Sequence, residues 1–137
     1  MIVDRRSWIG LLALLGLGAG SAPLAAAPVA PRTDRKRMIH HVFFWLKNPA
    51  STADRDRLIA GLQTLRAIPE IRELRIGVPA PTEDRSVVDS SYAVSELMMF
   101  DTVADQARYQ DHPIHQRFVA TCGDLWERVV VYDSIDV

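Results

Sequence analysis

The segment YQDHPIHQRF, residues 109–118, carries the side chains of this chain that are best suited to chemistry. Tyr109 precedes two histidines, His112 and His115, which stand three residues apart on either side of Pro113. An imidazole that is kept neutral can act as a general base. A phenol can donate a hydrogen bond to an oxygen that gains negative charge during a reaction. The segment is therefore a candidate for acid–base catalysis, with His115 and Tyr109 as the catalytic candidates.

The same segment also has a structural interpretation, which centres on Pro113. Proline has no amide hydrogen and fits the first position of a helix, so we expect a helix from Pro113 to about Leu125. His112 comes just before that helix, where side chains often cap free backbone N–H groups. We therefore interpret His112 first as a cap, and keep it second as a residue that contacts a substrate.

His115 is expected to point inward. In the predicted helix it shares a seam with four other residues, Phe118, Val119, Cys122 and Trp126. Burial and the nearby helix N-terminus both disfavour a charged imidazole, which favours a role as a base. The alternative is a core histidine that locks the junction of two helices. Tyr109 likewise is either a hydrogen-bond donor in a cavity or a core aromatic residue.

The strand predicted at residues 38–46, MIHHVFFWL, contains two further histidines. Alternation places His41 on one face with Phe43, and His40 on the opposite face. We expect the face of His41 to reach the same cavity as the two catalytic candidates. The residues predicted to bind a substrate in that cavity are His41, Phe43, His112 and Phe118.

No metal and no cofactor is expected. His41, His112 and His115 could supply nitrogen ligands, but no carboxylate pattern near them completes a metal-binding motif. The chain has no G-x-G-x-x-G, G-x-S-x-G or Walker sequence, which argues against nucleotide binding and serine-hydrolase chemistry. The formal net charge of −1 argues against a nucleic-acid partner, because binding phosphates needs a concentrated basic face.

The 137 residues are enough for about one domain, and their pattern predicts the order strand, helix, strand, strand, helix, strand. The predicted strands are residues 38–46, 70–78, 92–100 and 128–137, and the helices begin after Ser51, after Asp101 and at Pro113. This order favours an α+β, ferredoxin-like βαββαβ sandwich with an antiparallel four-stranded sheet. Apolar side chains point to both faces of the sheet, so we expect a homodimer that packs the sheets face to face.

Residues 1–27 have the layout of a secretory signal peptide. Arg5 and Arg6 precede an apolar stretch that ends near Leu17, and small residues follow. The arginine pair resembles a twin-arginine signal, while Asp4 in place of serine or threonine leaves the general secretory route open. We therefore expect export to the periplasm, a linker at residues 28–37, and no stable membrane association after the signal is removed.

Five segments together resemble the dimeric α/β-barrel, or stress-responsive A/B barrel (Dabb), family over residues 38–136. They are HHVFFWLKNP, IPEIRELRIGVPA, SYAVSELMMF, YQDHPIHQRFV and LWERVVVYDS. The resemblance implies a ferredoxin-like protomer that dimerises face to face into an α/β barrel, with an apolar cavity between sheet and helices. Some family members are polyketide cyclases, in which the residues that match Tyr109 and His115 take part in catalysis. The histidine of their first strand corresponds to His41 here.

Membership of such a family is a better guide to fold than to function, so three functions stay open. The first is a stress-associated domain that binds a small apolar or carbonyl-containing ligand between the sheet and the helices. The second is a cofactor-independent enzyme of the cyclase or lyase type, with His115 as general base and Tyr109 as oxyanion donor. The third, by analogy of fold alone, is a monooxygenase-like activity.

Overall fold

The structure of the protein, a computed structural model, describes residues 36–137. The signal peptide predicted at residues 1–27 lies outside these residues, and so do residues 28–35 of the predicted linker. The domain predicted at residues 38–136 is described over its whole length.

A four-stranded antiparallel sheet forms one layer of the domain. One of its two inner strands, β1 (Met38–Leu46), pairs with β3 (Val94–Phe100) on one side and with β4 (Trp126–Ile135) on the other. β2 (Glu73–Gly77) pairs with the outer edge of β3, which gives the order β2-β3-β1-β4. β2, β3 and β4 differ by a few residues at their ends from the strands predicted at 70–78, 92–100 and 128–137.

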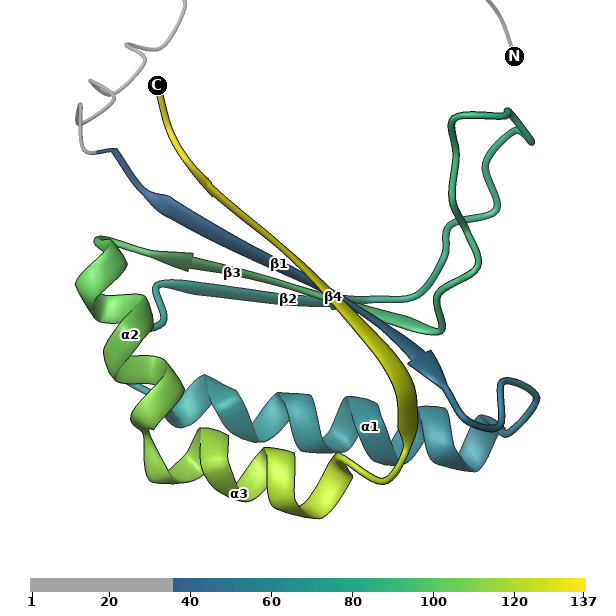
Figure 1. Ribbon diagram of the computed structural model, residues 1–137, viewed down its shortest axis with the longest axis horizontal. Helices are drawn as coiled ribbons and strands as arrows, with labels where there is room; N and C mark the ends of the chain where they lie inside the picture. The colour runs from purple at the N-terminus through teal and green to yellow at the C-terminus, as the bar shows by residue number, and fades with distance from the viewer. Residues whose placement is uncertain (1–35) are drawn as a thin grey trace, which may run out of the picture. The chain divides into compact units, whose positions relative to one another are not determined.

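The helices form the second layer. α1 (Thr52–Thr64), α2 (Val103–Asp111) and α3 (Pro113–Cys122) all lie on the same side of the sheet, as Figure 1 shows, and a short 3-10 helix, η1 (Leu65–Ala67), continues α1. Helices on one face of an antiparallel sheet make the ferredoxin-like α+β sandwich that the sequence predicts. None of the helices in the described part of the chain is both long and apolar enough to span a membrane.

Local capping explains where α1 and α2 begin. The Ser51 hydroxyl accepts a hydrogen bond from the backbone N–H of Asp54 at 3.1 Å, as expected for the start of α1. A helix that begins directly after Asp101 would have Asp101 as its cap, and this expectation is wrong by one residue. Thr102 has extended backbone angles and its hydroxyl accepts from the N–H of Asp105 at 3.0 Å, so that Thr102 is the cap.

α3 differs from the prediction at its C-terminal end. It ends at Cys122, not near Leu125, and Trp126 belongs to β4. Val119 is 45% exposed, so it is not part of the inward seam that the sequence predicts. The reason lies in the packing of α3 on α1, which turns Phe118 and Cys122 toward Gly61 and leaves Val119 at the border.

The core fills the space between the two layers. Its members include Val42, Phe44, Leu46, Val94, Met98 and Phe100 from the sheet, Leu58, Leu62 and Leu65 from the α1–η1 segment, and Tyr109 and Phe118 from α2 and α3. α1 and α3 approach closely at Gly61, where an added Cβ atom would lie 2.5 Å from the Cys122 sulfur. A larger side chain at Gly61 would therefore push α3 away from α1.

The other face of the sheet carries a surface that we call the open face, made by Ile39, His41, Phe43, Trp45, Tyr92 and Tyr132. No helix among residues 36–137 covers this face (Figure 1). The loop 78–93 leaves one end of the sheet and extends on the side away from the helices (Figure 1). The indole N–H of Trp45 donates to the Ser91 hydroxyl at 2.9 Å and ties this loop to the sheet.

Candidate functional site

His40 is the histidine of β1 that faces the helices. Its side chain is buried, and its Nδ1 atom lies 2.6 Å from a carboxylate oxygen of Asp133, the residue directly opposite in β4. An ionised carboxylate accepts only, so the Nδ1 atom of His40 carries the hydrogen that it donates. This contact leaves the Nε2 atom of neutral His40 without a hydrogen and able to accept a proton.

Tyr109 lies over His40 from the last turn of α2. The two ring centroids are 6.0 Å apart, and the ring of Phe100 lies 5.3 Å from Tyr109 on the side of the sheet. Burial raises the pKa of the Tyr109 phenol, and the nearby carboxyl of Glu96 raises it further. The phenol therefore stays protonated near neutral pH, and in this state it can donate a hydrogen bond.

His115 lies on the other side of Tyr109, with its ring centroid 4.5 Å away. Its Nδ1 atom is 3.0 Å from the backbone carbonyl oxygen of Gln110, which can only accept a hydrogen bond. Burial lowers the pKa of His115; the Gln110 carbonyl opposes this shift, and His40 adds to it. His115 is therefore neutral near pH 7, with Nδ1 as donor and Nε2 as a free base.

His112 sets the angle between α2 and α3. Its Nδ1 atom accepts a hydrogen bond from the backbone N–H of Ile114 at 3.2 Å, and Pro113 is the first residue of α3. The prediction that His112 caps this helix is confirmed. The junction turns both Tyr109 and His115 toward the sheet, so that the two catalytic candidates are brought together as expected. A contact of His112 with a substrate stays a prediction.

The structure does not bring His41 and Phe43 to this site. Both lie on the open face, where their ring centroids are 4.2 Å apart and the ring of Tyr92 lies 4.9 Å from Phe43. The predicted alternation along β1 is correct, but the face was chosen wrongly, and His40 takes the place expected for His41. Phe118 does lie beside the site, 6.4 Å from the ring of His115.

Sequence reasoning also missed Glu96, which lies on the helix-facing side of β3. It is 2% exposed, and its Oε2 atom has no hydrogen-bond partner. Burial raises the pKa of this carboxyl to about 8. The signal was present in the strand VSELMMF, where a glutamate occupies one of the apolar alternating positions.

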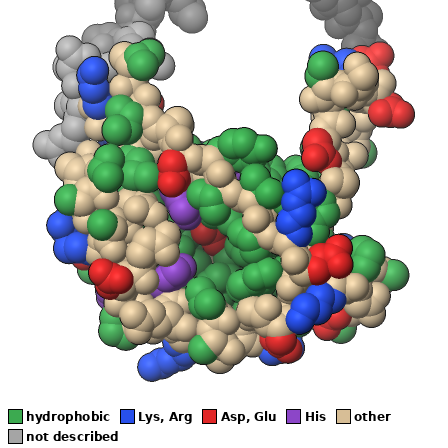
Figure 2. Space-filling model, viewed as in Figure 1, with side chains coloured by type: hydrophobic (Ala, Val, Ile, Leu, Met, Phe, Trp, Pro, Cys, Tyr) green, Lys and Arg blue, Asp and Glu red, His purple; other side chains and the backbone are tan. Residues whose placement is uncertain are grey.

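His40, Tyr109 and His115, which we call the histidine–tyrosine cluster, lie between the sheet and the helices. The face of the molecule shown in Figure 2 has a hollow, in which histidine side chains and an acidic side chain lie among hydrophobic ones. In residues 36–137 no three His, Cys, Asp or Glu side chains come together in a way that could hold a metal ion. What the cluster offers is a pair of imidazole bases beside a phenol donor.

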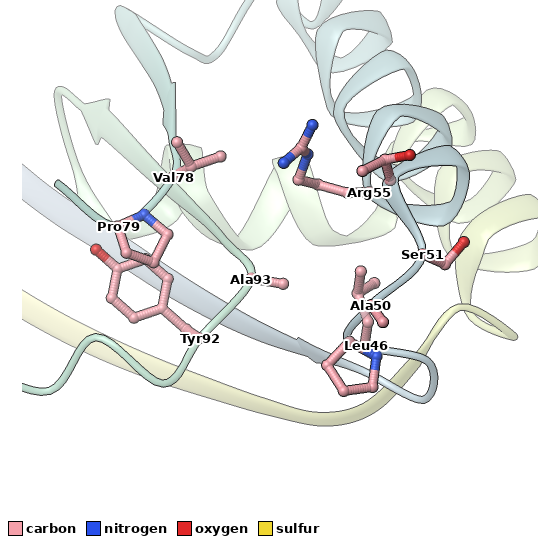
Figure 3. A pocket seen from close by; sticks show the side chains of 10 residues that line it. Leu46, Ala50, Ser51, Arg55, Val78, Pro79, Tyr92 and Ala93 are labelled. Atoms are coloured by element: carbon pink, nitrogen blue, oxygen red, sulfur yellow. The ribbon is translucent and has the colours of Figure 1, made fainter. Parts of the chain in front are cut away.

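A separate cavity of about 270 Å³ lies at the other end of β1 (Figure 3). Its walls come from the end of β1, the start of α1 and the ends of the loop 78–93. The residues that line it are Leu46, Pro49, Ala50, Ser51, Thr52, Arg55, Val78, Pro79, Tyr92 and Ala93. None of the residues predicted for the site lines this cavity, so it is distinct from the histidine–tyrosine cluster.

The profile of one family, described as Stress responsive A/B Barrel Domain, matches residues 38–136. A comparison with curated proteins gives no match.

Three solved structures illustrate what the fold is similar to. A hydroxynitrile lyase from Passiflora edulis is 26% identical, with a TM-score of 0.63, 75% of this chain covered and 95% of that chain. A Dabb family protein with a ferredoxin-like fold from Mesorhizobium loti is 23% identical, with a TM-score of 0.61 and coverage of 74% and 98%. A dimeric ferredoxin-like protein of unknown function from Thermobifida fusca is 20% identical, with a TM-score of 0.59 and coverage of 74% and 92%.

Proposed function

Because this chain belongs to the family of stress-responsive A/B barrel domains, we propose that it binds a small carbonyl-containing compound and moves a proton on it without a cofactor. One observation carries the proposal. His40 and His115 both donate through Nδ1, to Asp133 and to the Gln110 carbonyl, and so keep Nε2 free as a base beside Tyr109. A histidine that only packs in a core does not need its Nε2 atom kept free beside a phenol.

The proposed step is the removal of a proton from the carbon next to a carbonyl group. The Nε2 atom of His115 takes the proton, and the electron pair of the broken C–H bond forms a C=C bond to the carbonyl carbon. The π electron pair of the C=O bond moves to the oxygen, which becomes an enolate oxygen. The Tyr109 hydroxyl donates a hydrogen bond to that oxygen. Return of the proton from the His115 imidazolium to carbon, or exchange of that proton with water before the return, restores both the neutral base and the carbonyl compound.

The relative from Passiflora edulis gives this proposal some chemical support, because its name describes the cleavage of a hydroxynitrile. Cleavage of a hydroxynitrile yields a carbonyl compound, which is the class of compound proposed for this chain. For this chain we propose only the broader cyclase or lyase type of proton transfer. The monooxygenase-like alternative depends on analogy of fold alone and stays a prediction.

We also propose that the protein is a homodimer in which two open faces meet. Tyr132 in β4 is 64% exposed, and aromatic and aliphatic side chains surround it on that face. Large exposed apolar surfaces on a sheet mark an interface. Relatives of the same fold are described as dimeric, and a second copy would cover the open face by symmetry.

Export to the periplasm is a further proposal, supported by the signal-like layout of residues 1–27. Cell fractionation of the producing bacterium and N-terminal sequencing of the purified protein test it. A mature protein that begins near residue 27 or 28 in the periplasmic fraction supports export. A cytoplasmic protein that still carries Met1 contradicts it.

Deuterium exchange tests the proposed chemistry without knowledge of the natural substrate. Acetophenone is incubated with the protein in D2O, and loss of its methyl proton signal is followed by NMR. We expect exchange above the buffer rate, and slower exchange in His115→Ala, His40→Ala and Tyr109→Phe. Val103→Ser, on the exposed surface of α2, is the matched control and should exchange like the wild type. Binding of acetophenone without any exchange would instead identify a binding domain.

A further inference from the structure

Glu96 is a buried acid that the proposed chemistry does not use. It lies in the middle of β3, opposite Val42 of β1 and opposite Ile76 of β2. Glutamate is rarely buried to this degree unless it is paired, because an unpaired buried polar group costs free energy. Its Oε2 atom has no partner, so the fold itself does not use this part of the carboxyl group.

The surroundings of Glu96 place it at the histidine–tyrosine cluster. His40 is its diagonal neighbour on β1, since Val42 lies directly opposite Glu96 and His40 is two residues away on the same face. Tyr109 of α2 is close enough for the charge of Glu96 to raise the pKa of its phenol. Tyr109 in turn contacts His115 of α3.

The other elements that pack around Glu96 bring no charge of their own to it. β2 presents Leu74 and Ile76 on this face, and α1 presents Leu58 and Leu62. From β4, Asp133 reaches the site only through its contact with His40. No ion pair of Glu96 with a lysine or arginine is found within residues 36–137. The surroundings of the carboxyl are therefore apolar, with the His40 imidazole and the Tyr109 phenol as its polar neighbours.

The protonation state of Glu96 follows from this environment. Burial raises its pKa to about 8, so the carboxyl is mainly neutral at pH 7. A neutral carboxylic acid is a hydrogen-bond donor as well as an acceptor, whereas a carboxylate only accepts. At neutral pH this part of the core therefore holds two O–H donors, one on Tyr109 and one on Glu96.

We propose that Glu96 is the residue that selects the ligand: its O–H group donates a hydrogen bond to the carbonyl oxygen of an uncharged compound bound beside Tyr109. The inference rests on the proposed function and names the ligand class of the same site. Two donors aimed at one oxygen would favour a ketone or an aldehyde over a hydrocarbon of the same shape. When Glu96 ionises above about pH 8, it repels that oxygen and the preference is lost.

A matched pair of probes tests this selection. Acetophenone and ethylbenzene differ in the carbonyl oxygen, and their dissociation constants for the purified protein are measured by competition in ligand-observed NMR at pH 7. We expect wild type to prefer acetophenone by roughly threefold to tenfold, the effect of one net hydrogen bond. Glu96→Leu should weaken this preference, because only the Tyr109 donor remains, and Glu96→Gln, whose amide still donates, should keep most of it.

Each outcome bears on one proposal or on both. A preference that is unchanged in Glu96→Leu overturns the role of Glu96 and leaves the proposed proton transfer by His115 standing. A preference that depends on Glu96 without any deuterium exchange supports the inference and overturns the proposed chemistry. If neither probe binds to wild type, both are wrong.

A second measurement follows the carboxyl group itself. The side-chain 13C resonance of Glu96, assigned by its absence in Glu96→Gln, is titrated with and without acetophenone. We expect an unusually high pKa that rises further when the ketone binds, because the ligand binds the protonated form. A carboxyl that titrates near the value of an exposed glutamate, or whose titration ignores the ligand, overturns the inference.

Discussion

The Nδ1 atom of His40 lies 2.6 Å from a carboxylate oxygen of Asp133, a residue 93 positions further along the chain. The contact exists because β1 and β4 pair side by side and place these two residues directly opposite each other. His40 is buried, while about half of the Asp133 side chain is exposed. Asp133 therefore fixes the tautomer of a buried imidazole from the edge of the sheet.

Asp133→Ala should remove this control and lower the free energy of unfolding by about 1–3 kcal/mol, because the buried Nδ1 donor of His40 loses its acceptor. We expect the imidazole of His40 to lose its single tautomer, and deuterium exchange on acetophenone to slow by about tenfold or more, as for other residues that orient a histidine. The 15N shifts of His40 report the tautomer. Asp136→Ala is the matched control, since Asp136 is also an acid near the end of the chain and, within residues 36–137, hydrogen-bonds the backbone of Arg37 and not a histidine. Unchanged 15N shifts and exchange rates would show that Asp133 has no such role.

Glu96 should make the folded domain less stable as the pH rises. Its pKa is near 4.5 in an unfolded chain and about 8 in the folded domain. Between these values the folded state holds a proton that the unfolded state releases, so the free energy of unfolding falls by up to about 1.4 kcal/mol per pH unit. Urea unfolding between about pH 5 and about pH 8 measures this slope.

Glu96→Leu should flatten that slope and raise the free energy of unfolding at pH 7 by about 1–3 kcal/mol, because it removes an unpaired buried carboxyl. Glu96→Gln separates the two effects, since it removes the titration and keeps a polar group. A pH slope that is the same in wild type and in both variants would show that the Glu96 carboxyl is solvated.

His40 and His41 show most clearly what can and cannot be predicted from the sequence. The period of two in β1 shows that they lie on opposite faces, and the order of elements predicts the fold. The choice between the two faces depends on where the helices pack, and β1 is apolar on both sides. The resemblance to the family made His41 the candidate, whereas the structure brings His40 to Tyr109.

Other parts of the site depend on contacts that local patterns do not contain. His112 and Pro113 indicate the helix junction in the sequence, and the structure has the junction at these residues. The acceptors of the two imidazoles, Asp133 and the Gln110 carbonyl, become visible only when strands and helices are assembled. Glu96 was visible as an exception to an apolar pattern, but its role depends on its neighbours across the sheet.

His112→Ala should destabilise the domain by about 0.5–2 kcal/mol, because it removes the acceptor for the Ile114 N–H at the start of α3. His112→Asn should recover much of this loss, since asparagine is a good cap. Thermal and urea unfolding compare the variants. Equal stability of His112→Ala and wild type would contradict a capping role, and a loss of acetophenone binding in the stable His112→Asn would support the predicted substrate contact.

Phe43→Glu should break the homodimer. Phe43 lies on the open face, with the rings of His41 and Tyr92 within 4.2 Å and 4.9 Å of its own, and a charge buried between two sheets is strongly unfavourable. Sedimentation velocity at micromolar concentration should show a dimer for wild type and a monomer for Phe43→Glu. Val103→Glu, which adds the same charge on the helical side, should remain dimeric. A dimeric Phe43→Glu would place the interface elsewhere.

Gly61→Ala should destabilise the domain although alanine favours helices. A Cβ atom at Gly61 would lie 2.5 Å from the Cys122 sulfur and 3.1 Å from the Phe118 ring, so α3 must move. Overpacking of this kind costs about 1–3 kcal/mol, more than the helix propensity returns.

The displacement also carries His115 away from Tyr109, so deuterium exchange should slow in Gly61→Ala. Cys122→Ala removes the sulfur and makes room for the new methyl group. The double variant should therefore be more stable than the sum of the two single effects predicts, and a double-mutant cycle from urea unfolding measures the difference. Strictly additive effects would show that Gly61 of α1 and Cys122 of α3 are not in close contact.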